Sequence, residues 1–227
     1  MMSKQASATF AAATPLRSPA AGSSAVIADH PSVFERIFDA DVTICIWNRP
    51  PDPILANYLR TSAGSGSWER RARVDATSPN FEELLTGFQA DVGRVRWVTE
   101  LTALVDLFTA LTDARTVGVR ITATDRATCP RFHCDQVGLR LLCCWVGEGT
   151  EFLAEEDVIR DAVGSRQGSV GFAAGPVRLG GVVRQMRSFA VGVFKGDLWS
   201  GNEGRGAVHR SPQPEGWRVF VSLDELC

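Results

Sequence analysis

The chain has 227 residues, of which 44% are hydrophobic and 22% are charged, and its 24 basic and 26 acidic side chains give a net charge of −2. This length predicts one compact domain with enough apolar residues for a sizeable core. The balance of charge argues against a protein that binds nucleic-acid phosphates, which usually has a basic surplus. No apolar run approaches the roughly 18 residues of a membrane-spanning helix. We therefore expect a cytoplasmic protein that binds neither nucleic acid nor membrane.

Residues 1–28 are rich in Ala and Ser and lack the apolar block of a signal peptide. We expect a disordered tail here, with an organellar targeting segment as the alternative. Six cysteines in a chain of this length, without a signal peptide, favour free thiols in a reducing compartment.

The stretch 29–115 is predicted to be mostly helical. Helices are expected over 30–38, 54–60, 81–92 and 97–114, and a strand over 41–47. In the last helix, apolar residues recur at spacings of three and four, as in Leu101, Leu104, Val105 and Phe108. This pattern places one apolar stripe against a core.

A basic cluster, Arg70, Arg71 and Arg73, follows a Gly/Ser-rich loop over 62–67. The favoured interpretation is a solvated loop edge, and a site for an anionic ligand is the alternative.

The stretch 116–227 changes to short β-rich runs separated by Gly, Pro, Asp and Asn. Strands are expected within 117–124, 139–146, 168–175, 186–194, 206–209 and 218–226. Regular short strands with turn residues between them are typical of a barrel or sandwich. The predicted class is α+β, with a C-terminal double-stranded β-helix (a jelly-roll, cupin-like barrel) packed against the N-terminal helices.

Three residues of this β-rich half have the types that bind a metal ion. His133 and Asp135 are two residues apart, and side chains at i and i+2 of an extended segment project to the same face. His209 follows near the end of a Gly-rich turn. Two imidazoles and one carboxylate suit non-haem Fe(II), because they leave positions open for a chelating cosubstrate and dioxygen.

The order of motifs around this triad resembles the prolyl-hydroxylase-like branch of the Fe(II)/2-oxoglutarate oxygenases. In that branch, a His-x-Asp motif precedes an Arg-bearing strand, a Gly- and Thr-containing turn, a Gly-Asp strand start, the distal His, and a basic residue shortly after it. The corresponding residues here lie within 129–224, where the basic residue is Arg218.

The resemblance implies roles for individual residues. His133, Asp135 and His209 would bind the iron, Arg218 would bind the distal carboxylate of 2-oxoglutarate, and Ser222 would add a hydroxyl contact. Arg140, which lies among leucines, would support the cosubstrate site or orient Asp135. Phe220 stands where these oxygenases often have Ser, so an iron oxygenase that does not use 2-oxoglutarate is an alternative.

The same half of the chain resembles a bacterial domain-of-unknown-function family, number 1826. The resemblance is carried by CPRFHCDQVGLRLL, GEGTEF and GNEGRGAVHRSP. It groups His133, Asp135 and His209 in one pattern and implies no activity.

Three functions compete at this point. The leading hypothesis is an iron oxygenase, with 2-oxoglutarate as the expected cosubstrate, that oxidises an unidentified small molecule or peptide. The second is a zinc-binding homeostasis protein that uses the triad or Cys129. The roles of Cys134, Cys143 and Cys144 stay open, with small buried apolar side chains as the favoured interpretation. The third is a barrel that binds a small molecule without a metal.

Each of these residues also has a purely structural interpretation. His133 and Asp135 would form a pair that orders a loop, His209 would be exposed in a turn, and Arg218 would form a surface pair with Asp224 or Glu225. The oligomeric state stays open.

Overall fold

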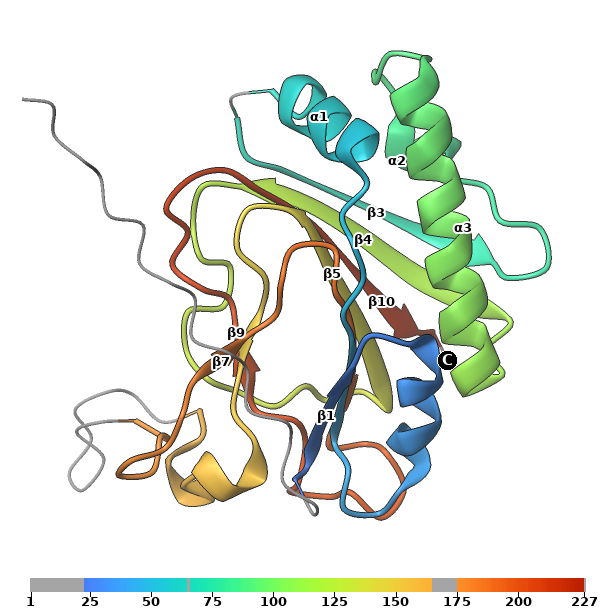
Figure 1. The fold of residues 1–227 in the computed structure, drawn as a ribbon. Helices are drawn as coiled ribbons and strands as arrows, with labels where there is room; N and C mark the ends of the chain where they lie inside the picture. Colours follow the sequence, from blue (N-terminus) through green and yellow to red (C-terminus); the bar gives the residue numbers. More distant parts are fainter. Residues whose placement is uncertain (1–22, 65, 165–174, 227) are drawn as a thin grey trace, which may run out of the picture.

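The computed structural model describes residues 23–64, 66–164 and 175–226. Its main element is a seven-stranded sheet that runs through the centre of the molecule (Figure 1). In spatial order its strands are β1 (Ala25–Ala28), β2 (Ile44–Trp47), β8 (Val191–Lys195), β5 (Leu139–Val146), β10 (Arg218–Glu225), β4 (Thr116–Thr124) and β3 (Trp68–Asp75). Only β1 and β2 pair in parallel, so the sheet is largely antiparallel.

A smaller sheet lies against one face of this large sheet. Its strands, in spatial order, are β7 (Arg184–Gln185), β6 (Glu151–Phe152) and β9 (His209–Arg210). The space between the two sheets is filled by an apolar cluster that includes Ile44, Leu142, Phe152, Met186 and Phe194.

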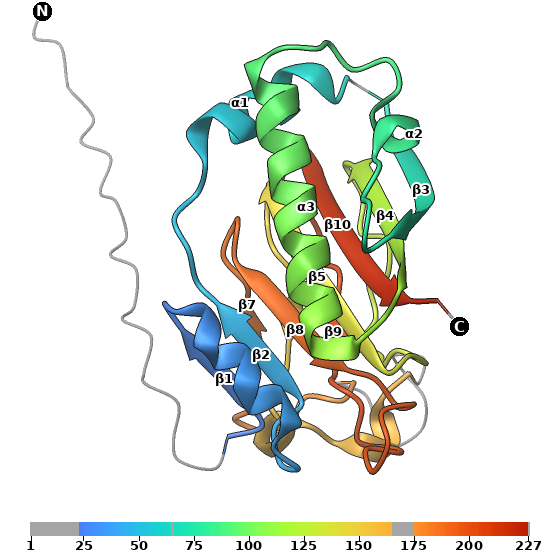
Figure 2. The same ribbon diagram turned by 90° about the vertical axis from the view of Figure 1, so that its right-hand side faces the viewer.

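Helices cover the opposite face of the large sheet, as Figure 2 shows for α3. These helices are α1 (Pro53–Ser62), α2 (Glu82–Leu85), α3 (Val92–Thr112) and the 3-10 helix η1 (Pro31–Phe38). Two further 3-10 helices, η2 (Glu155–Asp157) and η3 (Arg160–Ala162), lie beside the small sheet (Figure 1). The apolar stripe of α3 packs on the inward residues of β4, β5, β8 and β10, as the spacing predicted. Among the residues that the structure describes, no helix is both long enough and apolar enough to cross a membrane.

The α+β class is confirmed at this level, because helices pack on a large antiparallel sheet. Five of the strands expected within 116–227 coincide with observed ones in whole or in part, and β5 has the bounds that the sequence predicted. The run 168–175 lies almost wholly outside the described residues. The division of the chain at residue 115 stays a prediction.

Several expectations were wrong in detail. Residues 25–28 were assigned to a disordered tail, but they form β1, because their backbone pairs with β2. The helix expected over 81–92 shrinks to the single turn of α2, since Gly87 adopts a positive φ of 81° and ends it. The basic cluster is not a loop edge: Arg70, Arg71 and Arg73 lie on β3, which pairs with β4.

Helices α1 and α3 approach closely at Gly93, in the first turn of α3. A Cβ atom added there would overlap the ring of Tyr58, whose hydroxyl donates a hydrogen bond to the carbonyl of Gln89. The position therefore needs glycine, although glycine is a poor residue for a helix.

We expect Gly93→Ala to lower the free energy of unfolding by about 2 kcal/mol, since overpacking a filled core costs roughly 1–3 kcal/mol. Helix propensity alone predicts the opposite sign, a gain of about 1 kcal/mol. Urea denaturation measures the difference, with Gly66→Ala as the control because an added Cβ meets nothing there. A stabilised Gly93→Ala variant would contradict the packing argument.

Candidate metal centre

The two histidines of the predicted triad are brought together by backbone pairing. His133 and His209 form an antiparallel bridge in which the amide of each donates to the carbonyl of the other, at 3.0 and 3.1 Å. Residues paired in this way project their side chains to the same face. Their imidazole centroids are consequently 4.6 Å apart, although the residues are far apart in the sequence.

Asp135 completes the group from its position two residues after His133. Its carboxylate oxygens lie 3.5 Å from Nε2 of His133 and 3.1 Å from Nε2 of His209. All three potential ligand atoms lie within 4.8 Å of one another, and this is the one group of metal-ligating side chains found in the described ranges. The structure therefore brings the three predicted ligands together.

The hydrogen bonds of the histidines fix which nitrogen faces the centre. Nδ1 of His133 lies 2.9 Å from the carbonyl of Arg131, and Nδ1 of His209 lies 3.0 Å from the carbonyl of Ala207. Because a carbonyl only accepts, each Nδ1 carries the proton, and in the neutral ring the lone pair is on Nε2. Both Nε2 atoms point toward Asp135, as in histidines that bind metal ions.

The electrostatics of the centre also suit a cation. Burial alone would raise the pKa of Asp135, but His133, His209 and Arg140 hold it well below its usual range. Asp135 raises the pKa of His133, against the effect of burial. One carboxylate oxygen, Oδ2 of Asp135, is buried and faces Nε2 of His209 at 3.1 Å, which in the neutral ring has no proton to donate, so this oxygen accepts no hydrogen bond from the described residues. A bound cation would satisfy it.

Arg140, on β5, connects two carboxylates. Its Nη1 lies 2.7 Å from Oδ1 of Asp135, and its Nε and Nη2 donate to the carboxylate of Asp224. Arg140 thus contacts Asp135, the partner that the sequence suggested, and its role in orienting Asp135 stays a prediction. Its guanidinium is occupied by carboxylates, so its expected part in cosubstrate binding stays a prediction.

The other two predicted cosubstrate residues lie on the same face of β10 as Asp224. Arg218 is 1% exposed and donates to the carbonyl of Glu148 (2.6 Å) and to Oγ of Ser211 (2.8 Å). Ser222 is fully buried, and its hydroxyl accepts a hydrogen bond from Nε of Arg120. A register shift between Val219 and Phe220 occurs next to Arg218.

The purely structural interpretations of these residues differ from what the structure shows. His209 is 5% exposed rather than an exposed turn residue. Arg218 forms no surface pair with Asp224 or Glu225, because it is 1% exposed and lies at the opposite end of β10 from both. The loop-ordering pair of His133 and Asp135 is part of a larger group that includes His209.

The site opens on the side of His133. The His133 side chain is 29% exposed, whereas those of Asp135 and His209 are 11% and 6% exposed. The ring of Phe194 covers His209, with 5.1 Å between centroids. Of the three side chains, His133 is therefore the most accessible from solvent.

The cysteines do not take part in the group. Cys134 donates to the carbonyl of Gly206, and Cys143 and Cys144 are buried on opposite faces of β5. Cys129 is exposed. A zinc site made from these thiols has no support in the described residues.

Sequence reasoning did not single out Arg120 as a functional residue, and it considered Asp224 only as a partner for Arg218. The signal was available in part: Arg218, Phe220, Ser222 and Asp224 alternate along one strand and so share a face. Which residues of β4 and β5 lie opposite them depends on strand pairing, which the sequence does not show.

Comparison with known proteins identifies the family. The sequence model of the family described as "Protein of unknown function (DUF1826)" matches residues 28–224. The chain therefore belongs to this family, as its motifs indicated. No curated protein matches it.

Solved structures that resemble the chain include oxygenase-class enzymes. One is a Pseudomonas putida prolyl-4-hydroxylase, with 9% identity, a TM-score of 0.43, and coverage of 86% of this chain and 97% of that one. Another is a dioxygenase for auxin oxidation in rice, with 15% identity, a TM-score of 0.41, and coverage of 86% and 67%. A third is a full-length Neurospora crassa protein in complex with alpha-KG, with 13% identity, a TM-score of 0.41, and coverage of 72% and 55%.

We expect His133→Ala and His209→Ala each to weaken Co(II) binding by roughly 100-fold or more, because each removes a ligand atom. Arg140→Met should weaken it by roughly 10–100-fold, since it releases Asp135 from its support. Titration followed by the visible bands of Co(II) measures the affinities. His30→Ala is the matched control, because His30 is the remaining histidine and bonds only locally, to Ser32. Full Co(II) affinity in His133→Ala would refute the centre.

The thiols should differ strongly in reactivity. Burial raises the pKa of Cys45 to about 12 and those of Cys134 and Cys144 to about 11, whereas Cys129 is exposed. We expect iodoacetamide at pH 8 to alkylate Cys129 roughly tenfold faster or more than the other described cysteines, because the thiolate is the nucleophile. Peptide mass spectrometry measures the rates, and the same reaction in urea is the control. Fast alkylation of native Cys144 would contradict this ranking.

Proposed function

We propose that this protein is a mononuclear non-haem Fe(II) oxygenase that uses 2-oxoglutarate as its cosubstrate. The observation that carries the proposal is the convergence of Nε2 of His133, Nε2 of His209 and a carboxylate oxygen of Asp135 within 4.8 Å. The family assignment supplies no activity, so the argument rests on this site.

The donor set fits iron. Two neutral imidazoles and one carboxylate are the ligands of the facial triad in non-haem Fe(II) oxygenases, which keeps further positions open for other molecules. Carboxylates also balance the charge of a divalent cation: Asp135 and Asp224 carry two negative charges and Arg140 one positive charge. His133, His209 and Asp135 would hold the iron.

Arg218 fits the distal carboxylate of 2-oxoglutarate. A guanidinium that is 1% exposed and makes no ion pair with a carboxylate of the described residues is costly unless an anion joins it. Its observed partners are a carbonyl and a hydroxyl, and its guanidinium lies 4.8 Å from the centroid of the Phe220 ring. The ring accounts for Phe220 in place of the usual Ser, since it packs under the cation.

The strand order supports a double-stranded β-helix. From β4 onward the chain passes mainly back and forth between the two sheets: β4, β5, β8 and β10 lie in the large sheet, and β6, β7 and β9 in the small one. The segment at His133 extends the small sheet through its bridge to His209. The triad and Arg218 would lie on the inner face of such a barrel.

The protein residues would bind, orient and shield the reactants. Arg140 would keep Asp135 ionised and aligned, the two backbone carbonyls would hold the imidazoles in the tautomer that binds metal, and Phe194 would exclude water beside His209. Bound iron would supply the reaction of dioxygen with 2-oxoglutarate and a C–H bond, which yields succinate, carbon dioxide and a hydroxylated product.

Anaerobic titration with Fe(II) and 2-oxoglutarate tests the proposal. We expect a weak metal-to-ligand band in the visible region that requires both components. Arg218→Met should raise the half-saturating concentration of 2-oxoglutarate by roughly 100-fold, because a buried charge pair is lost, and Arg218→Lys should restore part of the affinity.

Two controls separate binding defects from loss of metal or fold. Co(II) affinity should be unchanged in Arg218→Met, because Arg218 is not one of the predicted ligands. Arg60→Gln, at an exposed position of α1, should behave as wild type. A protein that binds Fe(II) but shows no band with 2-oxoglutarate would exclude this cosubstrate, and a protein isolated with one equivalent of tightly bound zinc would favour a zinc-binding role.

A further inference from the structure

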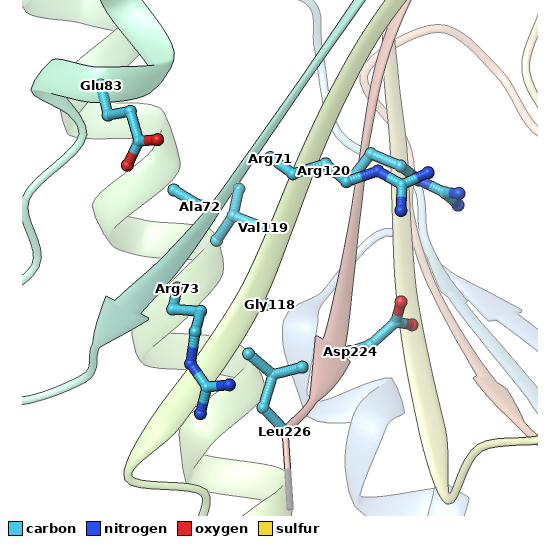
Figure 3. A pocket seen from close by; sticks show the side chains of 9 residues that line it. All are labelled: Arg71, Ala72, Arg73, Glu83, Gly118, Val119, Arg120, Asp224 and Leu226. Carbon is cyan, nitrogen blue, oxygen red and sulfur yellow. The ribbon is translucent and has the colours of Figure 1, made fainter.

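A second set of charged side chains lies on the part of the large sheet formed by β3, β4 and β10. There, a cavity of about 520 Å³ is lined by residues that include Arg71, Arg73, Arg120, Asp224 and Leu226. In Figure 3 the guanidinium groups of Arg71 and Arg120 lie together, that of Arg73 lies apart from them beside Leu226, and Glu83 on α2 lies across β3 from Arg120. The volume is in the range of pockets that bind small molecules, about 300–1,000 Å³.

The register of the strands explains why arginines gather here. Arg71 lies directly opposite Arg120, and Arg73 lies opposite Gly118. Like charges directly opposite each other on a sheet are destabilising. Gly118 places no side chain between Arg73 and β10, and the nearest side chain above it is that of Leu226. The strand pairing thus gathers the side chains of Arg71, Arg73 and Arg120 on one part of the sheet, with the apolar side chain of Leu226 beside them.

The three arginines outnumber Glu69 and Glu83, the nearby carboxylates that Arg140 does not hold. Glu69 pairs with Arg71, but that arginine side chain is 70% exposed, so the pair is weak. The carboxylate of Asp224 accepts hydrogen bonds from Nε and Nη2 of Arg140. Within the described part of the chain, Arg73 and Arg120 form no ion pair, and Nε of Arg120 donates to the hydroxyl of Ser222. Arg71 and Arg73 are exposed, whereas Arg120 is half-buried, so an anion in the cavity would stabilise Arg120 most.

Asp224 and Arg140 connect the cavity with the candidate metal centre. Asp224 lines the cavity and receives two hydrogen bonds from Arg140, and Arg140 contacts Asp135. A molecule held in this cavity would therefore lie on the side of the proposed iron ligands where Arg140 contacts Asp135.

We infer that the cavity lined by Arg71, Arg73 and Arg120 binds the acidic group of the substrate, a small molecule that carries a phosphate or carboxylate. This assignment rests on the proposed function, because it takes the triad as the place of reaction. Arginine suits the task, since its planar guanidinium forms paired hydrogen bonds with both kinds of anion. A cavity of this size accommodates a metabolite, and the chain's net charge of −2 gives no general attraction for nucleic acid.

The first test uses inorganic phosphate and the full chain without metal or 2-oxoglutarate. We expect millimolar binding by calorimetry, and Arg73→Gln and Arg120→Gln should each weaken it by about tenfold, as expected for one charge-assisted hydrogen bond. Arg60→Gln is the control, and circular dichroism verifies that each variant is folded. A parallel titration with acetate distinguishes a phosphate site from a carboxylate site.

The second test asks whether the anion lies beside the metal centre. With Mn(II) added, the ³¹P relaxation rate of bound phosphate should rise several-fold above its value with Zn(II). His133→Ala should lose this enhancement yet keep phosphate binding. The double variant Arg73→Gln/Arg120→Gln should lose both.

These tests separate the possible failures. Phosphate binding that is unchanged in Arg73→Gln and Arg120→Gln overturns the inference, as does an enhancement that persists in the double variant, because phosphate would then bind the metal. A short single-stranded oligonucleotide that binds 100-fold more tightly through the same arginines would also overturn it. If phosphate binds as expected but the 2-oxoglutarate titration fails, the anion site stands and only its link to oxygenase chemistry is lost.

Discussion

The candidate site depends on one backbone interaction, the antiparallel bridge between His133 and His209. Two reciprocal amide–carbonyl hydrogen bonds fix these residues opposite each other, and their Nδ1 atoms bond to the carbonyls of Arg131 and Ala207. The result is a pair of imidazoles that both direct Nε2 toward Asp135. Without this pairing the three donors would have no reason to meet, because short strands and loops provide them.

Arg140 is the second constraint, because it joins two charged regions that would otherwise be independent. It neutralises part of the charge of Asp135 and Asp224, and it fixes the orientation of both carboxylates. A buried arginine with two carboxylate partners is stable only while both remain in place. The candidate metal centre and the arginine-lined cavity are therefore connected through one guanidinium, that of Arg140.

The sequence predicted much of the core and part of the site. Strand β5 was predicted with its bounds, because continuous apolar and β-branched runs indicate buried strands, and α3 was predicted from its apolar spacing. Strand β3 was missed, since WERRARVD has few apolar residues and lies at a sheet edge, where charged side chains remain exposed. Strand β1 was missed because a four-residue strand in an Ala-rich stretch has no periodicity of its own.

The sequence by itself determined the chemical types available: two histidines and an aspartate in a β-rich half, followed by an arginine on an alternating strand. Only the tertiary structure decided which side chains meet. Strand pairing set Arg120 opposite Arg71, gave Asp224 to Arg140 rather than to Arg218, and left Arg218 buried without a carboxylate among the described residues. The physical reason is that pairing between distant strands is a long-range choice, made by the packing of the whole sheet, and local sequence patterns do not record it.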